Sequence, residues 1–196
     1  MYQFDWIKRH AERTRHKLAL VDAHTGRRFT YAQFNERANR FASFLRDTLG
    51  IQRGDRVSIL AQNSSDYFEV LFGCGKMGAI LNTLNWRLAV PELEYIINDC
   101  TPRVLIYEPD FAGAVDALRP QSGCEFYVVM ADEAPQGEWT YEGALAAGSP
   151  QGVEMPPLTY DDTWAIIYTS GTTGRQGGPG DLRQFLLQRC RHRPGH

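Results

Sequence analysis

Five short apolar runs separated by helical patterns constrain the possible fold of this 196-residue chain more than any other feature. Such runs are typical of strands buried in a sheet, and the segments between them are long enough to cross from one parallel strand to the next. We therefore predict an α/β fold with a parallel-rich sheet flanked by helices. The expected strands are Arg56–Leu60, Ala79–Leu81, Val104–Tyr107, Phe126–Met130 and Trp164–Tyr168.

Helix signals occupy the intervals between these runs. Thr30 and Gln33 form a capping-box pattern, in which a hydroxyl accepts a first-turn N–H while the glutamine reaches back to the cap. Apolar residues then recur at helical spacing, so we expect a helix over Tyr31–Leu49 that ends at Gly50. The other expected elements are a hairpin of Leu18–Asp22 with Arg28–Thr30, helices over Asp66–Met77 (capped by Ser64 or Ser65) and Pro91–Asp99, and a surface loop over Gln136–Pro157.

Composition argues against several classes of protein. The chain is 43% hydrophobic and 22% charged, with a formal net charge of -2, so no general basic field points to nucleic acid. No long apolar run or signal-peptide pattern is present, and we expect a cytoplasmic protein without a membrane span. The cysteines and the amino-terminal histidines lack metal-ligand spacing, which favours buried thiols and surface imidazoles. These residues are Cys74, Cys100, Cys124, Cys190, His10, His16 and His24.

The strongest candidate for chemistry follows the last apolar run. This segment, named here the candidate phosphate loop, consists of Thr169, Ser170, Gly171, Thr172, Thr173 and Gly174. Glycine lets the backbone approach a ligand closely with its N–H groups pointing inward, and the hydroxyls add donors without bulk. The carboxyl end of a strand is also where α/β sheets place ligands. Composition alone equally allows a plain Ser/Thr/Gly turn.

Lysine is scarce in this chain. It contains 18 arginines but only three lysines, Lys8, Lys17 and Lys76. The candidate phosphate loop is therefore not a Walker loop, which needs a lysine before its final hydroxyl residue. Any mechanism that needs a lysine beyond Lys76 cannot be carried out by this polypeptide alone.

Two other segments are unusual. Residues 73–78 match the G-x-G-x-x-G dinucleotide pattern, but here the pattern closes a helix and precedes a strand, the reverse of the order in a dinucleotide site. Close helix packing and a helix stop explain these glycines better. Asn82–Leu88 gathers amides, an indole and a guanidinium. We favour structural hydrogen bonding for this segment over contact with a ligand.

The candidate phosphate loop, read as TSGTTGR after IIY, resembles the nucleotide-binding signature of the adenylate-forming (AMP-binding) superfamily, which includes acyl-CoA synthetases, luciferases and peptide-synthetase adenylation domains. Three more blocks agree in order and spacing: TGRRFTYAQFNERANRFASFL, RGDRVSIL and NTLNWRLAVPELEYIINDC. The NWRL block is most similar to fatty-acyl and medium-chain acyl-CoA ligases. The likeness covers Phe4–Gly174 and implies that residues 1–178 are the amino-terminal part of an AMP-binding domain, an incomplete subdomain of the large domain.

This resemblance implies a two-step reaction. A carboxylate attacks the α-phosphate of ATP to give acyl-AMP and pyrophosphate, and the thiol of coenzyme A then displaces AMP. Residues 169–174 would cover the β- and γ-phosphates, with Mg²⁺ bridging the phosphates. The expected ligands are therefore ATP, Mg²⁺, coenzyme A and a carboxylic acid. The resemblance assigns no catalytic residue within this sequence.

The chain departs from the family after Arg175. The family continues with Pro-Lys-Gly, whereas Gln176, Gly177 and Gly178 stand here, so the loop lysine is absent. Residues 179–196 do not resemble the family. Permitted codons for Leu182–His196, read one base later, give a segment like the helix that family members place after the loop, which favours a frameshift-derived tail. A basic interaction tail is the alternative.

We therefore expect an ATP-dependent acyl-CoA synthetase by ancestry, acting on a fatty or other hydrophobic acid. The chain as written is expected to be a truncated piece that is inactive in complete turnover, with its sheet cut at an open edge beside Trp164–Tyr168. A non-catalytic binding or regulatory protein, or a pseudogene product, are the alternatives. Pyrophosphate release with added acids separates an enzyme from a binding protein.

We predict a shift of one or two bases near the codons for Arg175–Pro179. The family match stops there, and an alternate frame restores it. Resequencing of this region and of the DNA downstream is the measurement. If resequencing confirmed the present codons and found no family-like sequence in any reading frame, the prediction would be wrong.

Overall fold

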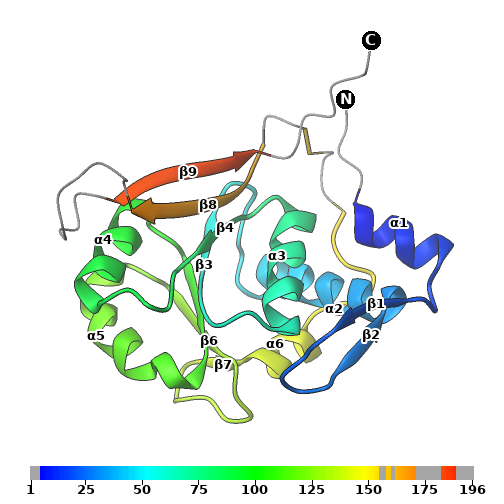
Figure 1. The fold of residues 1–196 in the computed structure, drawn as a ribbon, viewed down its shortest axis with the longest axis horizontal. Helices are drawn as coiled ribbons and strands as arrows, with labels where there is room; N and C mark the ends of the chain where they lie inside the picture. Colours follow the sequence, from blue (N-terminus) through cyan, green and yellow to red (C-terminus); the bar gives the residue numbers. More distant parts are fainter. Residues whose placement is uncertain (1–4, 155–157, 160–161, 171–181, 189–196) are drawn as a thin grey trace.

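A computed structural model describes residues 5–154, 158–159, 162–170 and 182–188. Its centre is a seven-stranded sheet in the order β7-β6-β5-β3-β4-β8-β9 (Figure 1). Neighbouring strands are parallel, except that β9 is antiparallel to β8. The predicted α/β fold with a parallel-rich sheet is therefore confirmed. The strands of this sheet are β3 (Arg56–Leu60), β4 (Ile80–Thr83), β5 (Val104–Tyr107), β6 (Phe126–Val129), β7 (Trp139–Thr140), β8 (Thr163–Ser170) and β9 (Leu182–Gln188).

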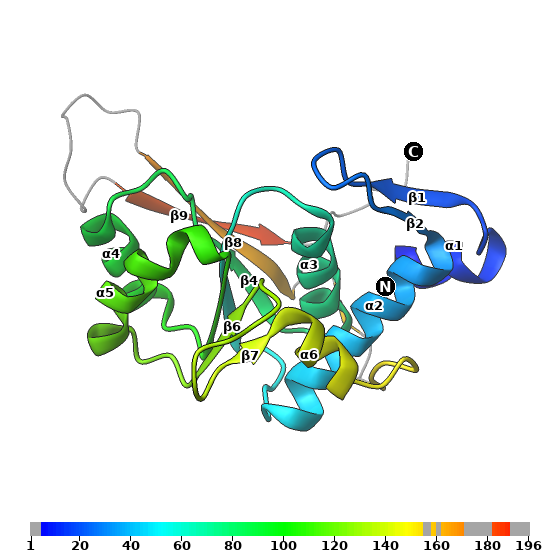
Figure 2. The same ribbon diagram turned by 90° about the horizontal axis from the view of Figure 1, so that it is seen from below.

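Helices cover both faces of the sheet (Figure 2). Side chains alternate along each strand, so Val57 and Ile59 pack in the cluster that contains residues of α2, α3 and α6. Leu60 and Leu105 pack in a second cluster, which contains residues of α4 and α5. The helices are α1 (Trp6–Arg13), α2 (Tyr31–Ser43), α3 (Ser65–Met77), α4 (Val90–Cys100), α5 (Ala112–Ser122) and α6 (Tyr141–Ala147), with a π-helical turn η1 (Phe44–Thr48) and a 3₁₀ turn η2 (Pro109–Phe111).

The predicted helix after Thr30 exists, but its last turns differ. The capping box is present: Oγ1 of Thr30 accepts the N–H of Gln33 at 3.3 Å, and Oε1 of Gln33 accepts the N–H of Thr30 at 2.9 Å. The regular helix α2 ends at Ser43, and the π-helical turn η1 continues the chain to Thr48. Phe44 and Leu45 in that turn are fully buried. Apolar spacing correctly predicted burial but could not distinguish the two helix types.

The prediction of a surface loop over Gln136–Pro157 was wrong for part of that segment. Strand β7 and helix α6 lie within it. The hydroxyl of Thr140 caps α6 by accepting the N–H of Gly143 at 3.0 Å. Leu145 of this short helix is buried in the core. The Gly and Ala content hid a short helix that tertiary packing stabilises. Helices α1 and α5 were also not predicted.

The sequence also suggested that the sheet ends at an open edge beside Trp164–Tyr168. That expectation was wrong, because β9 pairs along this edge from Ser170↔Leu182 to Thr163↔Gln188. Residues 182–188 lie beyond the part of the chain that resembles the family. The hydrogen-bonding edge of β8 is thus covered by the chain's own backbone.

Close packing and a helix stop, as predicted, explain two of the three glycines of the G-x-G-x-x-G match, Gly73 and Gly78. A Cβ at Gly73 of α3 would lie 2.8 Å from the ring of Phe41 and 3.2 Å from the carbonyl oxygen of Ala38, so this glycine allows α3 to approach α2 closely. Gly78 caps the carboxyl end of α3 with φ +81°, a conformation that favours glycine. The dinucleotide interpretation is not needed for either residue.

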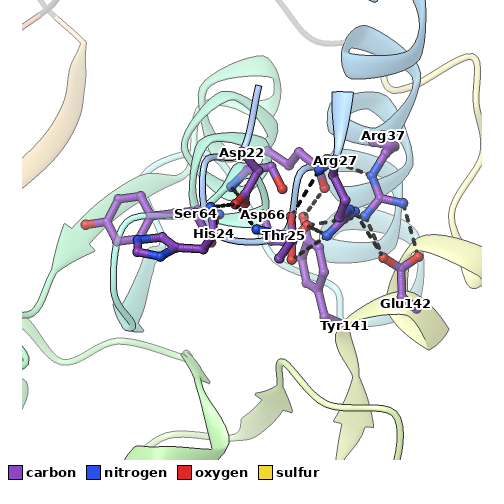
Figure 3. Close-up of polar contacts among 12 residues, drawn as sticks. Asp22, His24, Thr25, Arg27, Arg37, Ser64, Asp66, Tyr141 and Glu142 are labelled. Atoms are coloured by element: carbon purple, nitrogen blue, oxygen red, sulfur yellow. Dashed lines mark hydrogen bonds and ion pairs between the residues drawn. The ribbon is translucent and has the colours of Figure 1, made fainter. Parts of the chain in front are cut away.

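The predicted hairpin forms a separate two-stranded sheet of β1 (Leu18–Val21) and β2 (Arg28–Thr30). Asp22 fastens its turn to α3: the carboxylate accepts two N–H groups of the turn at 3.0 Å and that of Ser65 at 2.9 Å. These donors hold the pKa of Asp22 well below its ordinary value. Nη1 of Arg27 also donates to both carboxylate oxygens of Asp66, at 2.9 and 3.0 Å (Figure 3). The hairpin is therefore bound to the amino end of α3.

Arg37 on α2 is the centre of a polar cluster that joins α2, α3 and α6 (Figure 3). Its Nε donates to Oε1 of Glu69 at 2.6 Å, and its Nη2 donates to Oε1 of Glu142 at 2.6 Å. The hydroxyl of Tyr141 donates to the second oxygen of Glu69 at 3.0 Å. Both oxygens of a carboxylate with 0% exposure are thereby satisfied.

Burial raises the pKa of Glu69 from 4.5 to about 7, although Arg37 opposes this shift. The charge of Arg37 is shared with Glu142, so it compensates only part of the cost of removing Glu69 from water. Because the folded protein favours the protonated carboxyl, folding takes up a proton in this range. The contribution of Glu69 to stability is therefore full below the unfolded pKa and is lost as the pH rises towards about 7.

We predict that Glu69→Gln removes this loss. Glutamine is neutral at every pH and can still accept from Arg37, so the free energy of unfolding of the variant, relative to the parent chain, rises by roughly 3 kcal/mol from acidic to mildly alkaline pH. Denaturant unfolding across that range measures it. Glu142→Gln is the matched control with the opposite trend, because Arg37 lowers the pKa of Glu142. If the free energy of unfolding changed with pH in the same way for Glu69→Gln and the parent chain, the raised pKa of Glu69 would be contradicted.

Candidate functional site

The candidate phosphate loop begins at the carboxyl end of β8. Thr169 and Ser170 are the last residues of that strand, and Thr169 is exposed. Gly171, Thr172, Thr173 and Gly174 lie outside the described residues. The predicted start of the loop at a strand's carboxyl end, on the edge where α/β sheets place ligands, is therefore observed for Thr169 and Ser170.

The loop that follows β4 is the neighbour of this strand end. Thr83 pairs with Ile167, so the residues after β4 leave the sheet beside Thr169. Oδ1 of Asn85 accepts the N–H of Arg87 at 3.0 Å and closes a turn there. The guanidinium of Arg87 lies 4.0 Å from the centre of the Trp86 ring. This turn presents an exposed cation on an aromatic face at the same edge as the candidate phosphate loop.

Asn82 has the structural role that we favoured for its segment. Its side chain is buried in the middle of β4, and its Nδ2 donates to Oγ of Ser58 at 2.9 Å. Its Oδ1 has no hydrogen-bond partner among the described residues. The pair lies between sheet and helix, on the strand face that points towards α4.

Tyr168 fixes the end of β8 against α4. Its hydroxyl donates to Oδ2 of Asp99 at 2.5 Å. Burial, with the hydrogen bond to the carboxylate, raises the pKa of Tyr168 well above its ordinary value. The phenol therefore stays protonated and keeps its donor at physiological pH. Sequence reasoning missed this contact, because nothing in the spacing relates two residues 69 positions apart.

The strand order also defines a second position where a ligand could bind, at the carboxyl ends of β3 and β5. The chain passes from β3 to β4 on one side and then to β5 on the other, so the two loops after β3 and β5 diverge at a topological switch point. A hydrogen bond joins the two loops at this point: the N–H of Gln62, after β3, donates to Oε2 of Glu108, after β5, at 3.0 Å. Burial raises the pKa of Glu108. The candidate phosphate loop lies two strands away, after β8.

None of the three lysines of this sequence lies at the described start of the candidate phosphate loop. Lys76, the last lysine of the sequence, is on α3 with its side chain 7% exposed. Its ammonium contacts the carboxylate of Asp5 and donates to Asn35 at 2.8 Å. Burial lowers the pKa of Lys76. The described parts of the chain also contain no group of three His, Cys, Asp or Glu residues that could hold a metal ion.

Comparison with known proteins identifies the family. The chain belongs to the AMP-binding enzyme family, whose sequence profile matches residues 7–178. It is 36% identical over 174 residues to an indoleacetate–CoA ligase of Aromatoleum aromaticum, covering 89% of this chain and 33% of that protein. It is also 36% identical over 180 residues to a long-chain-fatty-acid–CoA ligase of Thermus thermophilus, covering 89% of this chain and 32% of that protein.

A solved structure shares the fold. The anthranilate CoA ligase AuaEII, in complex with anthranoyl-AMP, matches with a TM-score of 0.84 at 27% identity, covering 94% of this chain and 34% of that chain. The chain thus spans about a third of the length of these relatives. The resemblance drawn from the sequence blocks is confirmed at the level of family and fold. No helix in the described parts of the chain is long and apolar enough to cross a membrane.

Proposed function

We propose that this chain supplies the phosphate-binding part of an ATP-dependent acid–CoA ligase. The observation that carries the proposal is the family match over residues 7–178, together with a Ser/Thr/Gly segment that starts at the carboxyl end of β8. The named relatives act on indoleacetate and long-chain fatty acids, and AuaEII on anthranilate. A hydrophobic carboxylic acid is therefore the proposed substrate class.

The proposed reaction has two steps. A carboxylate oxygen forms a bond to the α-phosphorus of ATP while the bond to the β-phosphate breaks, and pyrophosphate leaves. The sulfur of coenzyme A then bonds to the acyl carbon, AMP leaves, and the thiol proton passes to solvent. Mg²⁺ supplies charge neutralisation on the triphosphate when it is bound.

Residues 169–174 are proposed to contact the β- and γ-phosphates. Backbone N–H groups freed by Gly171 and Gly174, with the hydroxyls of Thr172 and Thr173, would stabilise negative charge on the departing pyrophosphate. The hydrogen bond from Tyr168 to Asp99 would hold the strand end from which this segment departs.

A non-catalytic role is the second candidate for the chain as written. The sequence has no lysine after Lys76, and Lys76 itself is held by Asp5 and Asn35. The family's loop lysine is replaced within residues 176–178, so it cannot neutralise charge on the phosphates. A protein of this kind could bind ATP or a partner without turning over.

We predict that the purified 196-residue chain forms no acyl-CoA. The assay contains ATP, Mg²⁺, coenzyme A and a panel of straight-chain and aromatic acids, with the Thermus thermophilus ligase as the active control. The replacement of the family's loop lysine is the physical reason, because charge on the phosphates then lacks its positive partner. Thioester formation above that of a boiled sample would overturn the prediction.

A second prediction rests on the base shift proposed near Arg175–Pro179 and concerns the longer protein that the corrected frame would encode. Thr172→Ala or Thr173→Ala should slow pyrophosphate exchange about 100-fold, as loss of one preorganised donor does elsewhere, while binding of the acid changes little. Thr163→Ala is the matched control, because Thr163 lies at the other end of β8. Near-normal exchange in both loop variants would remove these hydroxyls from the chemistry.

A further inference from the structure

Positive charge is concentrated at the amino end of the chain. Residues 5–30 contain seven arginines and lysines and three acidic residues, a net charge of +4, whereas the whole chain has -2. Six of these cations are exposed and form no ion pair with any described acidic side chain. They are Lys8, Arg9, Arg13, Arg15, Lys17 and Arg28.

Large apolar side chains are exposed on the same elements and on α3 beside them. Trp6 on α1 is 55% exposed, Leu18 and Val21 on β1 are each 45% exposed, and Phe68 on α3 is 41% exposed. Trp6 and Phe68 line a groove of about 330 Å³ whose other lining residues include Ile7, Leu20, Phe34 and Phe72. Four of the five most exposed large apolar residues in the described parts of the chain therefore gather beside the unpaired cations.

Helix α1 places both kinds of residue on one face. Trp6, Arg9, His10 and Arg13 follow the i, i+3, i+4, i+7 spacing of a single helix face. Ile7, on another face, is buried against the hairpin and α2. The ring of His10 stacks on Tyr31 at 4.7 Å, which holds this part of α1 against α2. An indole and two guanidiniums are thus presented to solvent by a helix that is packed in place.

We propose that this surface, formed by α1, β1 and the exposed end of Phe68, docks on a lipid bilayer that contains anionic headgroups. Tryptophan partitions to the boundary between headgroups and acyl chains, and exposed cations beside it are attracted to acidic lipids. The exposed aliphatic side chains of Leu18 and Val21 favour a lipid surface over a nucleic acid, which would use the cations and stack its bases on the aromatic rings alone. The contact is peripheral, goes beyond the proposed enzymatic function and does not rest on it.

Co-sedimentation of the 196-residue chain with vesicles tests the proposal. One set of vesicles is phosphatidylcholine alone, and the other contains two parts phosphatidylcholine to one part phosphatidylglycerol. We expect binding to the mixed vesicles that weakens as salt is raised, and little binding to phosphatidylcholine alone. Absence of binding to the mixed vesicles, or capture by a single-stranded oligonucleotide but not by vesicles, would overturn the proposal.

Matched variants locate the surface. Arg13→Gln should lower the partition coefficient about fivefold, and Arg9→Gln with Arg13→Gln about 25-fold, since each basic residue near an anionic surface contributes a similar free energy. Arg87→Gln removes an exposed, unpaired cation after β4 and should leave partitioning unchanged. Equal losses for Arg13→Gln and Arg87→Gln would show that overall charge, and not this face, attracts the vesicles.

Trp6→Ala tests the apolar part by a separate readout. Vesicles with brominated acyl chains should quench the tryptophan fluorescence of the parent chain and quench that of Trp6→Ala much less. Tyr95→Ala, which truncates an exposed aromatic on α4, should keep the parent behaviour. Quenching that is unchanged in Trp6→Ala would contradict insertion of this side chain.

Discussion

Burial of both faces of a parallel sheet is the constraint on which the rest of this structure depends. Val57 and Leu60 of the central strand point to opposite faces, and each must be covered by helices. The connections that carry the chain from strand to strand supply those helices. The same arrangement brings the carboxyl ends of β4 and β8 to one edge, where Thr169 lies. The position of the candidate phosphate loop therefore follows from how the core is buried.

Polar contacts within this frame are arranged around fixed cations. Arg37 binds Glu69 and Glu142 together, so one guanidinium joins three helices through a buried carboxylate. Lys76 is used in the same way between α1 and α3. Cations with such partners hold elements together. The cations of α1 have no ion-pair partner in the described parts of the chain, which leaves them available to an external surface.

Much of this could be predicted from the sequence where the signal is local. The capping box at Thr30 and the apolar runs at Val57 and Val104 determine their elements through neighbouring residues alone. Helix α6 could not be predicted, since it is stabilised by burial of Leu145 in a core shared with the distant α2 and η1. The pairing of β9 and the hydrogen bond of Tyr168 to Asp99 also depend on long-range geometry. The net charge of -2 did not reveal the basic amino end, because a total for the whole chain does not show where the charges lie.

The central claim is that residues 169–174 meet the phosphates of ATP. Hydrogen exchange tests it most directly, because the backbone N–H groups are themselves the proposed donors. It is measured with and without ATP and Mg²⁺ on the longer protein that the base shift proposed near Arg175–Pro179 would encode. The account predicts slower exchange over residues 169–174 when ATP is bound, with little change over Gln62 and Glu108 at the switch point. Slower exchange at the switch point, with none over residues 169–174, would contradict it.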